Sequence, residues 1–293
     1  MLALWEFLLY RLAQGACSLL PLGISYFIAE RLGDGHFLFS HKDRNGVLQN
    51  LEVICGKIRK KERWEKGRKV FHNFGRYLVE FLRFPKLSRS FFLEDVAVEG
   101  LDHLDTALAK GKGAIIISAH LGSWEIGAAQ LSLLGYRVNA VVLPHPNPAV
   151  NRLFVQMRQQ KGIRVVVTEE PVWKLLDCLS RNEILLMVGD RDFSENGIEI
   201  TFFDRPAVFP KGPVTLALRS GSPLVIAFLL RDPTGRLRLL LRPPIFPKET
   251  GPFKENVRAL TQDIAHFFEK QIRKDPSQWL IFKPFWDSRE LVS

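Results

Sequence analysis

Two side chains in this sequence could share a proton, His120 and, five residues later, Glu125. On one continuous helix that offset turns through about 500°, so the two side chains would point roughly 140° apart. They can meet only if His120 lies on a turn before the helix and Glu125 lies in its first turn. A carboxylate in that place would fix the imidazole tautomer and stabilise the protonated ring. The same offset disfavours a helical metal pair, which needs a spacing of four residues.

The residues around the pair predict the turn that it requires. Residues 114–118 form an apolar, β-branched run with the length of a buried strand. Gly122 and Ser123 then precede an apolar stretch, which is a signal for the start of a helix. We therefore expect His120 where a buried strand passes into a helix. In open α/β sheets the carboxyl ends of the strands are where ligands bind.

The sequence supplies no obvious nucleophile for His120 to activate. It contains neither a serine or cysteine in an elbow motif nor a glycine-rich phosphate loop. The simplest completion is a substrate hydroxyl, which His120 deprotonates and which then attacks an activated acyl group. A hydrolase that uses water as the nucleophile is an alternative. We expect no metal and no bound cofactor.

Positive charge is concentrated in one part of the chain. Of the net charge of +10, residues 41–90 carry +9, from 14 Lys and Arg against five acids. Such a block predicts an anionic partner, namely lipid headgroups, an acidic protein or nucleic acid; a solvated helix face is the alternative. The aromatic residues of this block fall at core-type helical spacing and no nucleic-acid motif is present, so we expect no nucleic acid as partner. The three cysteines, Cys17, Cys55 and Cys178, indicate no disulfide framework and fit a reducing compartment.

The first 40 residues are the most apolar part of the chain. Residues 12–29 contain no charge, but Gly15, Pro21 and Gly23 interrupt them. Three interpretations are open: a broken helical hairpin that dips into one leaflet, a marginal single span, or a buried core helix. A cleaved signal peptide is disfavoured because Glu6 lies where such a peptide is positive. With the basic block that follows, the segment predicts a location at the cytoplasmic face of the cell membrane, peripheral or monotopic and possibly single-pass.

From residue 96 onward, strand and helix patterns alternate as in βα units. The predicted fold is α/β, with a mixed, mostly parallel sheet flanked by helices and an N-terminal helical membrane-associating segment. We divide the chain into membrane-associating helices (1–40), basic amphipathic helices packed on the core (41–95) and the α/β domain (96–293). The expected strands lie near 114–118, 136–143, 164–168, 184–188, 224–230 and 237–242, with a loop or short strands at 197–203. The expected helices lie near 124–131, 149–161, 172–181, 214–220 and 254–274.

Several short motifs accompany the His120 segment, SAHLGSWE. They are R-x3-G from Arg158, G-D-R-D around Asp190, F-F-D from Phe202, G-P-x2-L-A from Gly212 and D-P-x-Q-W from Asp275. In this order they resemble the bacterial lysophospholipid acyltransferase superfamily. Within it they resemble the branch of the late lipid A acyltransferases and the phosphatidylinositol mannoside acyltransferases. The likeness covers about residues 100–285.

The resemblance implies a membrane-associated enzyme. It would move a fatty acyl chain from an acyl carrier protein or coenzyme A thioester to a hydroxyl of a membrane glycolipid or lipid A-type precursor. It also implies His120 as the general base and Glu125 as its relay partner. A phosphatidylinositol mannoside-like or other phosphoglycolipid acceptor is the alternative within this class. A peripheral membrane scaffold without activity is the non-enzymatic alternative.

The resemblance carries over to five further residues as substrate-binding candidates. Arg158 matches an arginine near the headgroup or donor phosphate, and Glu199 resembles an acid near the acyl thioester. Asp190 and Arg191 end a strand beside the site, where a structural ion pair is the competing explanation. Lys211 replaces an acid of the glycerol-phosphate branch, which argues against a simple glycerol-phosphate acceptor. It would contact an acceptor phosphate or else face solvent in a loop.

Overall fold

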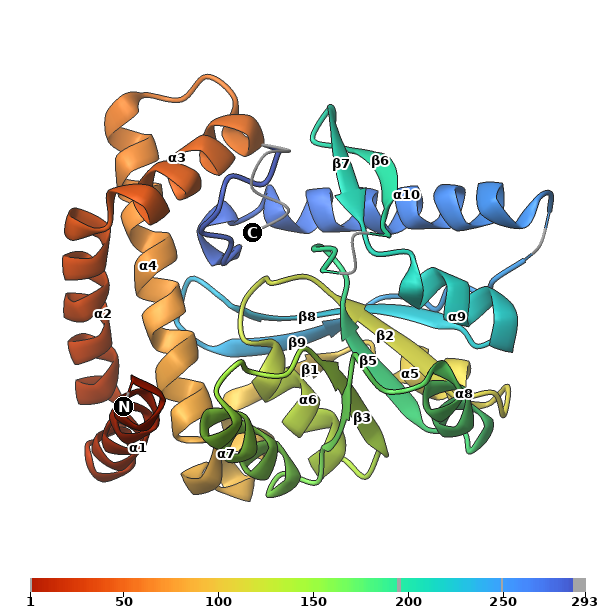
Figure 1. Ribbon diagram of the computed structural model, residues 1–293, viewed down its shortest axis with the longest axis horizontal. Coiled ribbons are helices and arrows are strands. Elements are labelled where there is room, and N and C mark those ends of the chain that lie inside the picture. Colours follow the sequence, from red (N-terminus) through yellow and green to blue (C-terminus); the bar gives the residue numbers. More distant parts are fainter. Residues whose placement is uncertain (1, 194–195, 249, 287–293) are drawn as a thin grey trace.

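A seven-stranded sheet forms the centre of the molecule, with the strand order β1-β9-β8-β2-β5-β3-β4 (Figure 1). The computed structural model describes residues 2–193, 196–248 and 250–286. Neighbouring strands run parallel except β8 and β9, which are antiparallel across the turn at 232–235. The predicted α/β fold with a mixed, mostly parallel sheet is confirmed. The strands are β1 (Val96–Glu99), β2 (Ala114–Ser118), β3 (Val138–Val142), β4 (Arg164–Val167), β5 (Ile184–Val188), β8 (Leu224–Arg231) and β9 (Leu237–Leu241).

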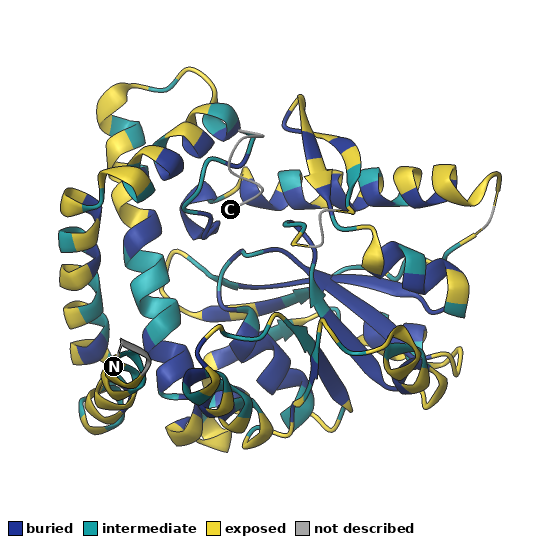
Figure 2. Cartoon of the chain, viewed as in Figure 1, coloured by how far each residue is buried: buried dark blue, intermediate teal, exposed yellow. Residues whose placement is uncertain are grey.

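Helices cover both faces of this sheet, which leaves its central strands buried (Figure 2). Every residue of β2 is buried, as its apolar sequence predicts. One face packs against α8 (Val172–Ser180), α9 (Gly212–Ser220) and α10 (Phe253–Ile272). The other packs against α5 (Leu101–Leu108), α6 (Trp124–Leu133) and α7 (Pro148–Gln159).

A separate two-stranded ribbon, β6 (Ile198–Phe202) and β7 (Arg205–Phe209), packs on α10. The short strand at β6 agrees with the sequence, whereas β7 was not predicted. The two strands are joined at Phe203 and Asp204, which have φ angles of 53° and 59°. Positive φ at two successive residues is the geometry of a tight hairpin turn.

Four helices precede the sheet: α1 (Leu2–Leu19), α2 (Leu22–Phe39), α3 (His41–Cys55) and α4 (Lys60–Leu82). The apolar N-terminus is broken at Pro21, the N-cap residue of α2. In Figure 1, α2 runs alongside α4, which stands beside the sheet. Across the described ranges, none of the helices has both the length and the apolar character needed to traverse a membrane. The division of the chain into three units stays a prediction.

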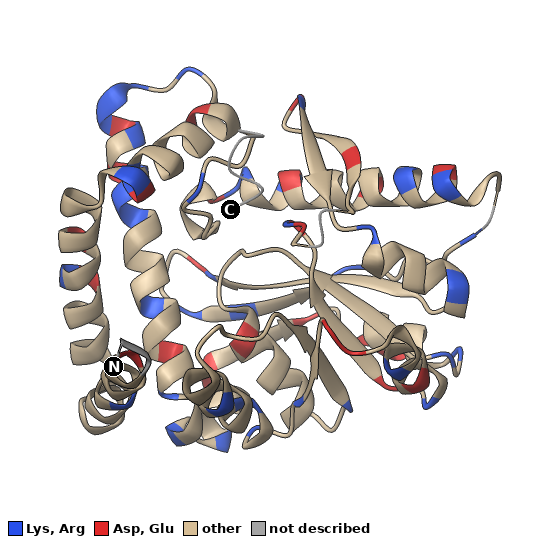
Figure 3. Cartoon of the chain, viewed as in Figure 1, with Lys and Arg blue, Asp and Glu red and all other residues tan. Residues whose placement is uncertain are grey.

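The outer sides of α1 and α2 carry large apolar side chains that no other part of the described chain covers. They are not buried core helices, because many of their large apolar side chains face solvent, although Phe37 of α2 is buried (Figure 2). Lys and Arg gather at the start of α4 and in the loop before it, at the end of α4 that lies away from α1 (Figure 3). The exposed apolar residues of α1 and α2 include Trp5, Leu9, Leu12, Leu19, Phe27, Leu32 and Phe39.

Candidate active site

His120 lies on the turn between β2 and α6, and Glu125 lies in the first turn of α6, as the sequence predicts. Backbone hydrogen bonds fasten this turn to its surroundings. The oxygen of His120 accepts from the amide of Leu280 at 2.8 Å, and the amide of Ser123 donates to the oxygen of Leu229 at 2.9 Å. Gly122 has a φ of 72°, and a Cβ there would lie 2.0 Å from the Leu229 oxygen. Only glycine therefore allows the turn to approach β8 this closely.

The carboxylate that holds His120 is Asp190, two residues after the end of β5. Asp190 is fully buried, and its Oδ1 lies 2.6 Å from Nδ1 of His120. Its Oδ2 accepts from the backbone amide of His120 and from Nε1 of Trp279, both at 2.9 Å. The sequence placed Asp190 beside the site as a substrate-binding candidate or a structural ion pair, and predicted Glu125 as the partner of His120. The structure instead joins Asp190 to the imidazole.

The surroundings keep the Asp190 carboxylate ionised. Burial alone would raise its pKa, but the charge of His120 and the hydrogen bonds from His120 and Trp279 outweigh burial and lower the pKa. An ionised carboxylate on Nδ1 fixes the imidazole tautomer. Nε2 is then the ring nitrogen that can accept a proton from a substrate.

Glu125 forms a buried ion pair with Arg158 of α7. Nη2 of Arg158 lies 2.5 Å from Oε1 of Glu125, and Nε lies 3.0 Å from Oε2. Burial alone would lower the pKa of Arg158, but the adjacent Glu125 charge raises it. The guanidinium fork matches a carboxylate in two places, which explains why Glu125 turns to Arg158 rather than to His120. The predicted direct contact between Glu125 and His120 therefore has no counterpart among the hydrogen bonds of the described residues.

His120, Glu125 and Arg158 line one cleft of about 740 Å³. Most of the exposed surface inside it is apolar, and its walls include Tyr77 and Trp124. Trp124 packs edge-on against His120, with ring centroids 5.2 Å apart. A cleft of this size and polarity suits a largely apolar ligand, with a few polar groups that orient it.

The remaining candidate residues differ in whether they line this cleft. Arg191 lines the cleft and lies over the ring of Phe193, 4.8 Å from its centroid. Burial lowers the pKa of Arg191, and the charge of Asp190 acts in the opposite direction. Lys211 is exposed at the start of α9, between two residues that line the cleft. Glu199 is exposed on β6 and is not one of the residues that line the cleft.

Two residues of the D-P-x-Q-W motif support the site although we assigned them no role. Trp279 donates to Asp190, as described above. Gln278 holds the backbone of Arg231 in both directions, accepting from its amide at 2.9 Å and donating to its oxygen at 2.8 Å. The motif was the sequence signal for this supporting role, because a tryptophan and an amide side chain that are buried together need hydrogen-bond partners. No cluster of three His, Cys, Asp or Glu that could hold a metal occurs in the part of the chain described here.

Comparison with known proteins identifies the family. The family of bacterial lipid A biosynthesis acyltransferases matches residues 1–288. The chain is 29% identical over 223 residues to the phosphatidylinositol mannoside acyltransferase of Mycobacterium tuberculosis H37Rv, covering 73% of this chain and 68% of that protein. It is 27% identical over 254 residues to the Mycolicibacterium smegmatis protein of the same name, covering 83% and 81%. It is 24% identical over 272 residues to the lipid A biosynthesis palmitoleoyltransferase of Escherichia coli K12, covering 89% and 84%. The chain therefore belongs to the bacterial lipid A biosynthesis acyltransferase family and is an acyltransferase.

Proposed function

We propose that this protein moves a fatty acyl chain from an acyl thioester to a hydroxyl of a membrane glycolipid or lipid A-type precursor, with His120 as the general base. One observation carries the proposal. The imidazole is held at Nδ1 by a buried, ionised Asp190 and lies in a mostly apolar cleft with Arg158 and Arg191 in its walls. That arrangement combines a proton acceptor with room for an acyl chain and positive charge for phosphate groups.

The reaction needs one proton acceptor and no nucleophile from the protein. Nε2 of His120 takes the proton of the acceptor hydroxyl while its oxygen attacks the thioester carbonyl carbon. The new ester C–O bond forms and the C–S bond breaks. The imidazolium then returns its proton to the leaving thiolate. Asp190 stabilises the imidazolium between these two transfers.

Charged residues around the cleft would orient the two substrates. Glu125 would act by holding Arg158 at the cleft wall, in place of the relay to His120 that the resemblance implies. Arg158 and Arg191 would contact phosphate groups of the donor or acceptor. Lys211, at the start of α9, would reach an acceptor phosphate. The role of Glu199 near the thioester rests on the resemblance alone.

The acceptor lipid would be met at a membrane surface. The exposed apolar sides of α1 and α2 would enter the lipid headgroup and acyl boundary, and the basic residues at the start of α4 would face anionic headgroups. This supports a peripheral or monotopic protein at the cytoplasmic face of the cell membrane. Positive charge would also attract either donor, because acyl carrier proteins and coenzyme A are both anionic.

A second acceptor class is favoured by the comparisons. The mannoside acyltransferase of Mycobacterium tuberculosis is 29% identical, against 24% for the palmitoleoyltransferase of Escherichia coli. A phosphatidylinositol mannoside-like or other phosphoglycolipid is therefore the alternative acceptor to a lipid A-type precursor.

Lipid mass spectrometry of cells tests the proposal and separates the two acceptors. We expect cells that lack the gene to accumulate a glycolipid lighter by one acyl chain, and the wild-type gene to restore the full mass. A gene encoding His120→Ala should fail to restore it although the protein is present in the membrane fraction. The headgroup of the affected lipid identifies the acceptor class. A lipid profile that does not change on deletion, or full restoration by His120→Ala, would contradict the proposal.

A further inference from the structure

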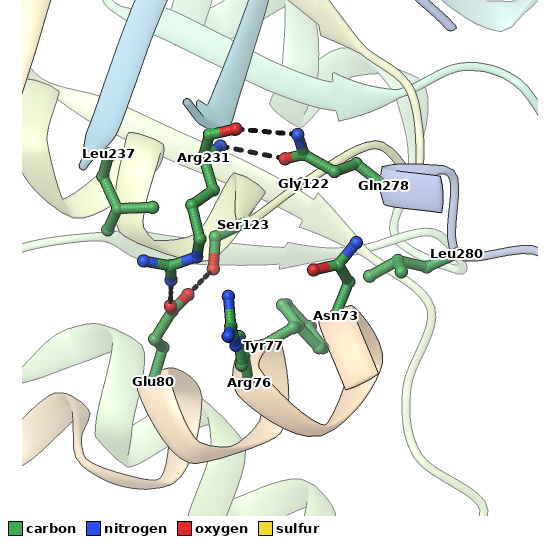
Figure 4. Close-up of a pocket in the computed structure, with 10 residues that line it drawn as sticks. All are labelled: Asn73, Arg76, Tyr77, Glu80, Gly122, Ser123, Arg231, Leu237, Gln278 and Leu280. Carbon is green, nitrogen blue, oxygen red and sulfur yellow. Dashed lines mark hydrogen bonds and ion pairs between the residues drawn. The ribbon is translucent and has the colours of Figure 1, made fainter. Parts of the chain in front are cut away.

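Besides Asp190, a second buried carboxylate holds the turn that carries His120. It is Glu80 of α4, which contacts Ser123 (Figure 4). Glu80 is only 2% exposed. Its Oε2 accepts from the hydroxyl of Ser123, and its Oε1 accepts from Nη2 of Arg231. The hydroxyl of Tyr26 donates to Oε1 at 2.8 Å. Three elements distant in the sequence thus meet at a single side chain.

Ser123 departs from the usual behaviour of a serine at this place. It is the N-cap residue of α6, where a serine hydroxyl normally accepts a hydrogen bond from a backbone amide of the first turn. Its side chain makes no such bond and donates to Glu80 instead. Ser123 lies three residues from His120 and forgoes the usual N-cap hydrogen bond. This indicates that its contact with Glu80 serves the site.

Tyr26 brings the N-terminal helices into the same network. It lies on α2, which also exposes Phe27 and other apolar residues to solvent. The helix backbones approach closely, since a Cβ on Gly75 of α4 would lie 2.8 Å from the oxygen of Ala29 on α2. This closeness places the Tyr26 hydroxyl within reach of Glu80. The helix that would rest on lipid is therefore two hydrogen bonds from the catalytic turn.

We propose that Glu80 is a positioning residue, which fixes the His120 turn to α2 through Ser123 and Tyr26 and so makes acyl transfer depend on the seating of that helix. The inference rests on the proposed function, because it assigns the turn a catalytic purpose. Arg231 neutralises the buried charge, and Gln278 holds Arg231 in place. The carboxylate can then bind both hydroxyls at once.

Ser123→Ala is the mildest test, because it removes the hydroxyl without removing a helix cap. In the full-length protein on vesicles, we expect kcat to fall about 10-fold, a typical loss for one hydrogen bond to a charged group. The KM for the thioester should stay within about 2-fold, because the walls of the cleft are unchanged. Tyr26→Phe should lower kcat in the same way. In a Glu80→Gln background, neither substitution should lower kcat further, because both act through the same carboxylate.

Glu30→Gln is the matched control. Glu30 pairs with Arg76, also between α2 and α4, with Nη2 of Arg76 at 2.5 Å from Oε1 of Glu30, but it does not contact the turn. We expect its kcat to stay within about 2-fold of the wild type. Hydrogen–deuterium exchange gives a second measurement that does not depend on turnover. The peptide that covers residues 119–124 should exchange faster in Ser123→Ala than in Glu30→Gln.

Two outcomes would overturn the positioning role. One is an unchanged kcat and an unchanged exchange rate in Ser123→Ala; the other is a loss in Glu30→Gln as large as in Ser123→Ala. Both leave the proposed function standing if the wild type acylates lipid and His120→Ala does not. A wild type that acylates no lipid would refute the proposed function instead, and the exchange rates would still decide whether Glu80 holds the turn.

Discussion

The sheet and the two N-terminal helices use the same apolar residue types in opposite ways. Ile115, Ile116 and Ile117 of β2 are at most 2% exposed, whereas Leu12 of α1 and Leu32 of α2 are 70% and 71% exposed. Burial in the sheet fixes the position of the backbone that carries His120. The helices present their apolar side chains outward, where they gain free energy only if something else covers them. One region therefore holds the candidate site rigidly, and the other exposes the apolar side chains that we propose meet lipid.

The charged groups follow the same division. At the site, Asp190 and Glu125 are buried and each has one cationic or imidazole partner. In the loop before α4 and at its first residues, basic side chains are exposed where an external anion can reach them, namely Lys57, Arg59, Lys60 and Lys61 (Figure 3). Buried pairs of this kind resist salt, whereas attraction of an exposed basic surface to anionic lipid weakens as salt screens it. Salt should therefore release the protein from vesicles without disturbing the site.

The largest predicted effect is on kcat and comes from Asp190, the carboxylate of the site that contacts His120. Asp190→Asn should lower kcat by about 10²–10⁴-fold, because the amide presents the wrong hydrogen-bonding group to Nδ1 of His120. Vesicle binding should not change, since the substitution lies in the other region. Steady-state kinetics and vesicle sedimentation on the same preparation measure both quantities. Loss of membrane binding together with activity would break the division into two regions.

Removal of Glu125 should act on stability. Glu125→Ala leaves the largely buried guanidinium of Arg158 without its carboxylate, which typically costs about 3–5 kcal/mol in the free energy of unfolding. Chemical denaturation measures this quantity. Glu170→Gln, which removes the charge that pairs with the exposed Lys174, is the control and should change stability by less than about 1 kcal/mol. A fall in kcat with an unchanged KM, in a Glu125→Ala protein of normal stability, would favour the relay to His120 instead.

Polar substitutions on α2 test whether the exposed apolar side of the N-terminal helices binds membrane. Phe27→Ser combined with Leu32→Ser should weaken binding to anionic vesicles by about 10–100-fold, since each removes apolar area that would enter the bilayer. The thermal midpoint should not fall, because neither side chain packs in the core. Trp173→Ser is the control, because Trp173 of α8 is equally exposed but lies away from α1 and α2. Equal losses from both variants would contradict a membrane surface confined to the N-terminal helices.

The smallest predicted effect concerns pH and the contact between α2 and α4. Hydrogen bonds from Arg68 and His72 lower the pKa of Asp34 below its ordinary value of 3.8. A lowered pKa means that the carboxylate stabilises the fold above about pH 4 and that this contribution is lost as pH falls toward the folded-state value. The difference in unfolding free energy between wild type and Asp34→Asn should therefore shrink below pH 4. A difference that is constant from pH 7 to pH 3 would contradict the pairing.

Local sequence patterns predicted most of the fold, because strand and helix periods depend on neighbouring residues. They placed β5 at residues 184–188 and placed His120 on the turn that follows β2. β7 escaped prediction because Pro206 lies within it and Pro210 directly follows it, and proline usually indicates a loop. The strand belongs to a two-stranded ribbon, in which both strands are edges and a proline is tolerated.

The partner of His120 could not be predicted in the same way. The contact with Asp190 joins residues 70 positions apart, and it follows from β2 and β5 being neighbours in the sheet. The sequence placed Asp190 at a strand end but could not show which strands are adjacent. For the same reason the pairing of Glu125 with Arg158, 33 positions apart, became visible only in the folded chain. Closeness in the sequence suggested Glu125 as the partner of His120, whereas adjacency of strands in the sheet brings Asp190 to it.

The most direct test uses purified protein, an acyl thioester and vesicles that contain the glycolipid acceptor. Acylated lipid, free fatty acid and released thiol are measured together. We predict that acylated lipid and thiol appear in equal amounts, that little free fatty acid forms, and that His120→Ala abolishes all turnover while it still binds the vesicles. Free fatty acid as the main product, or turnover that survives in His120→Ala, would contradict a histidine that activates a lipid hydroxyl.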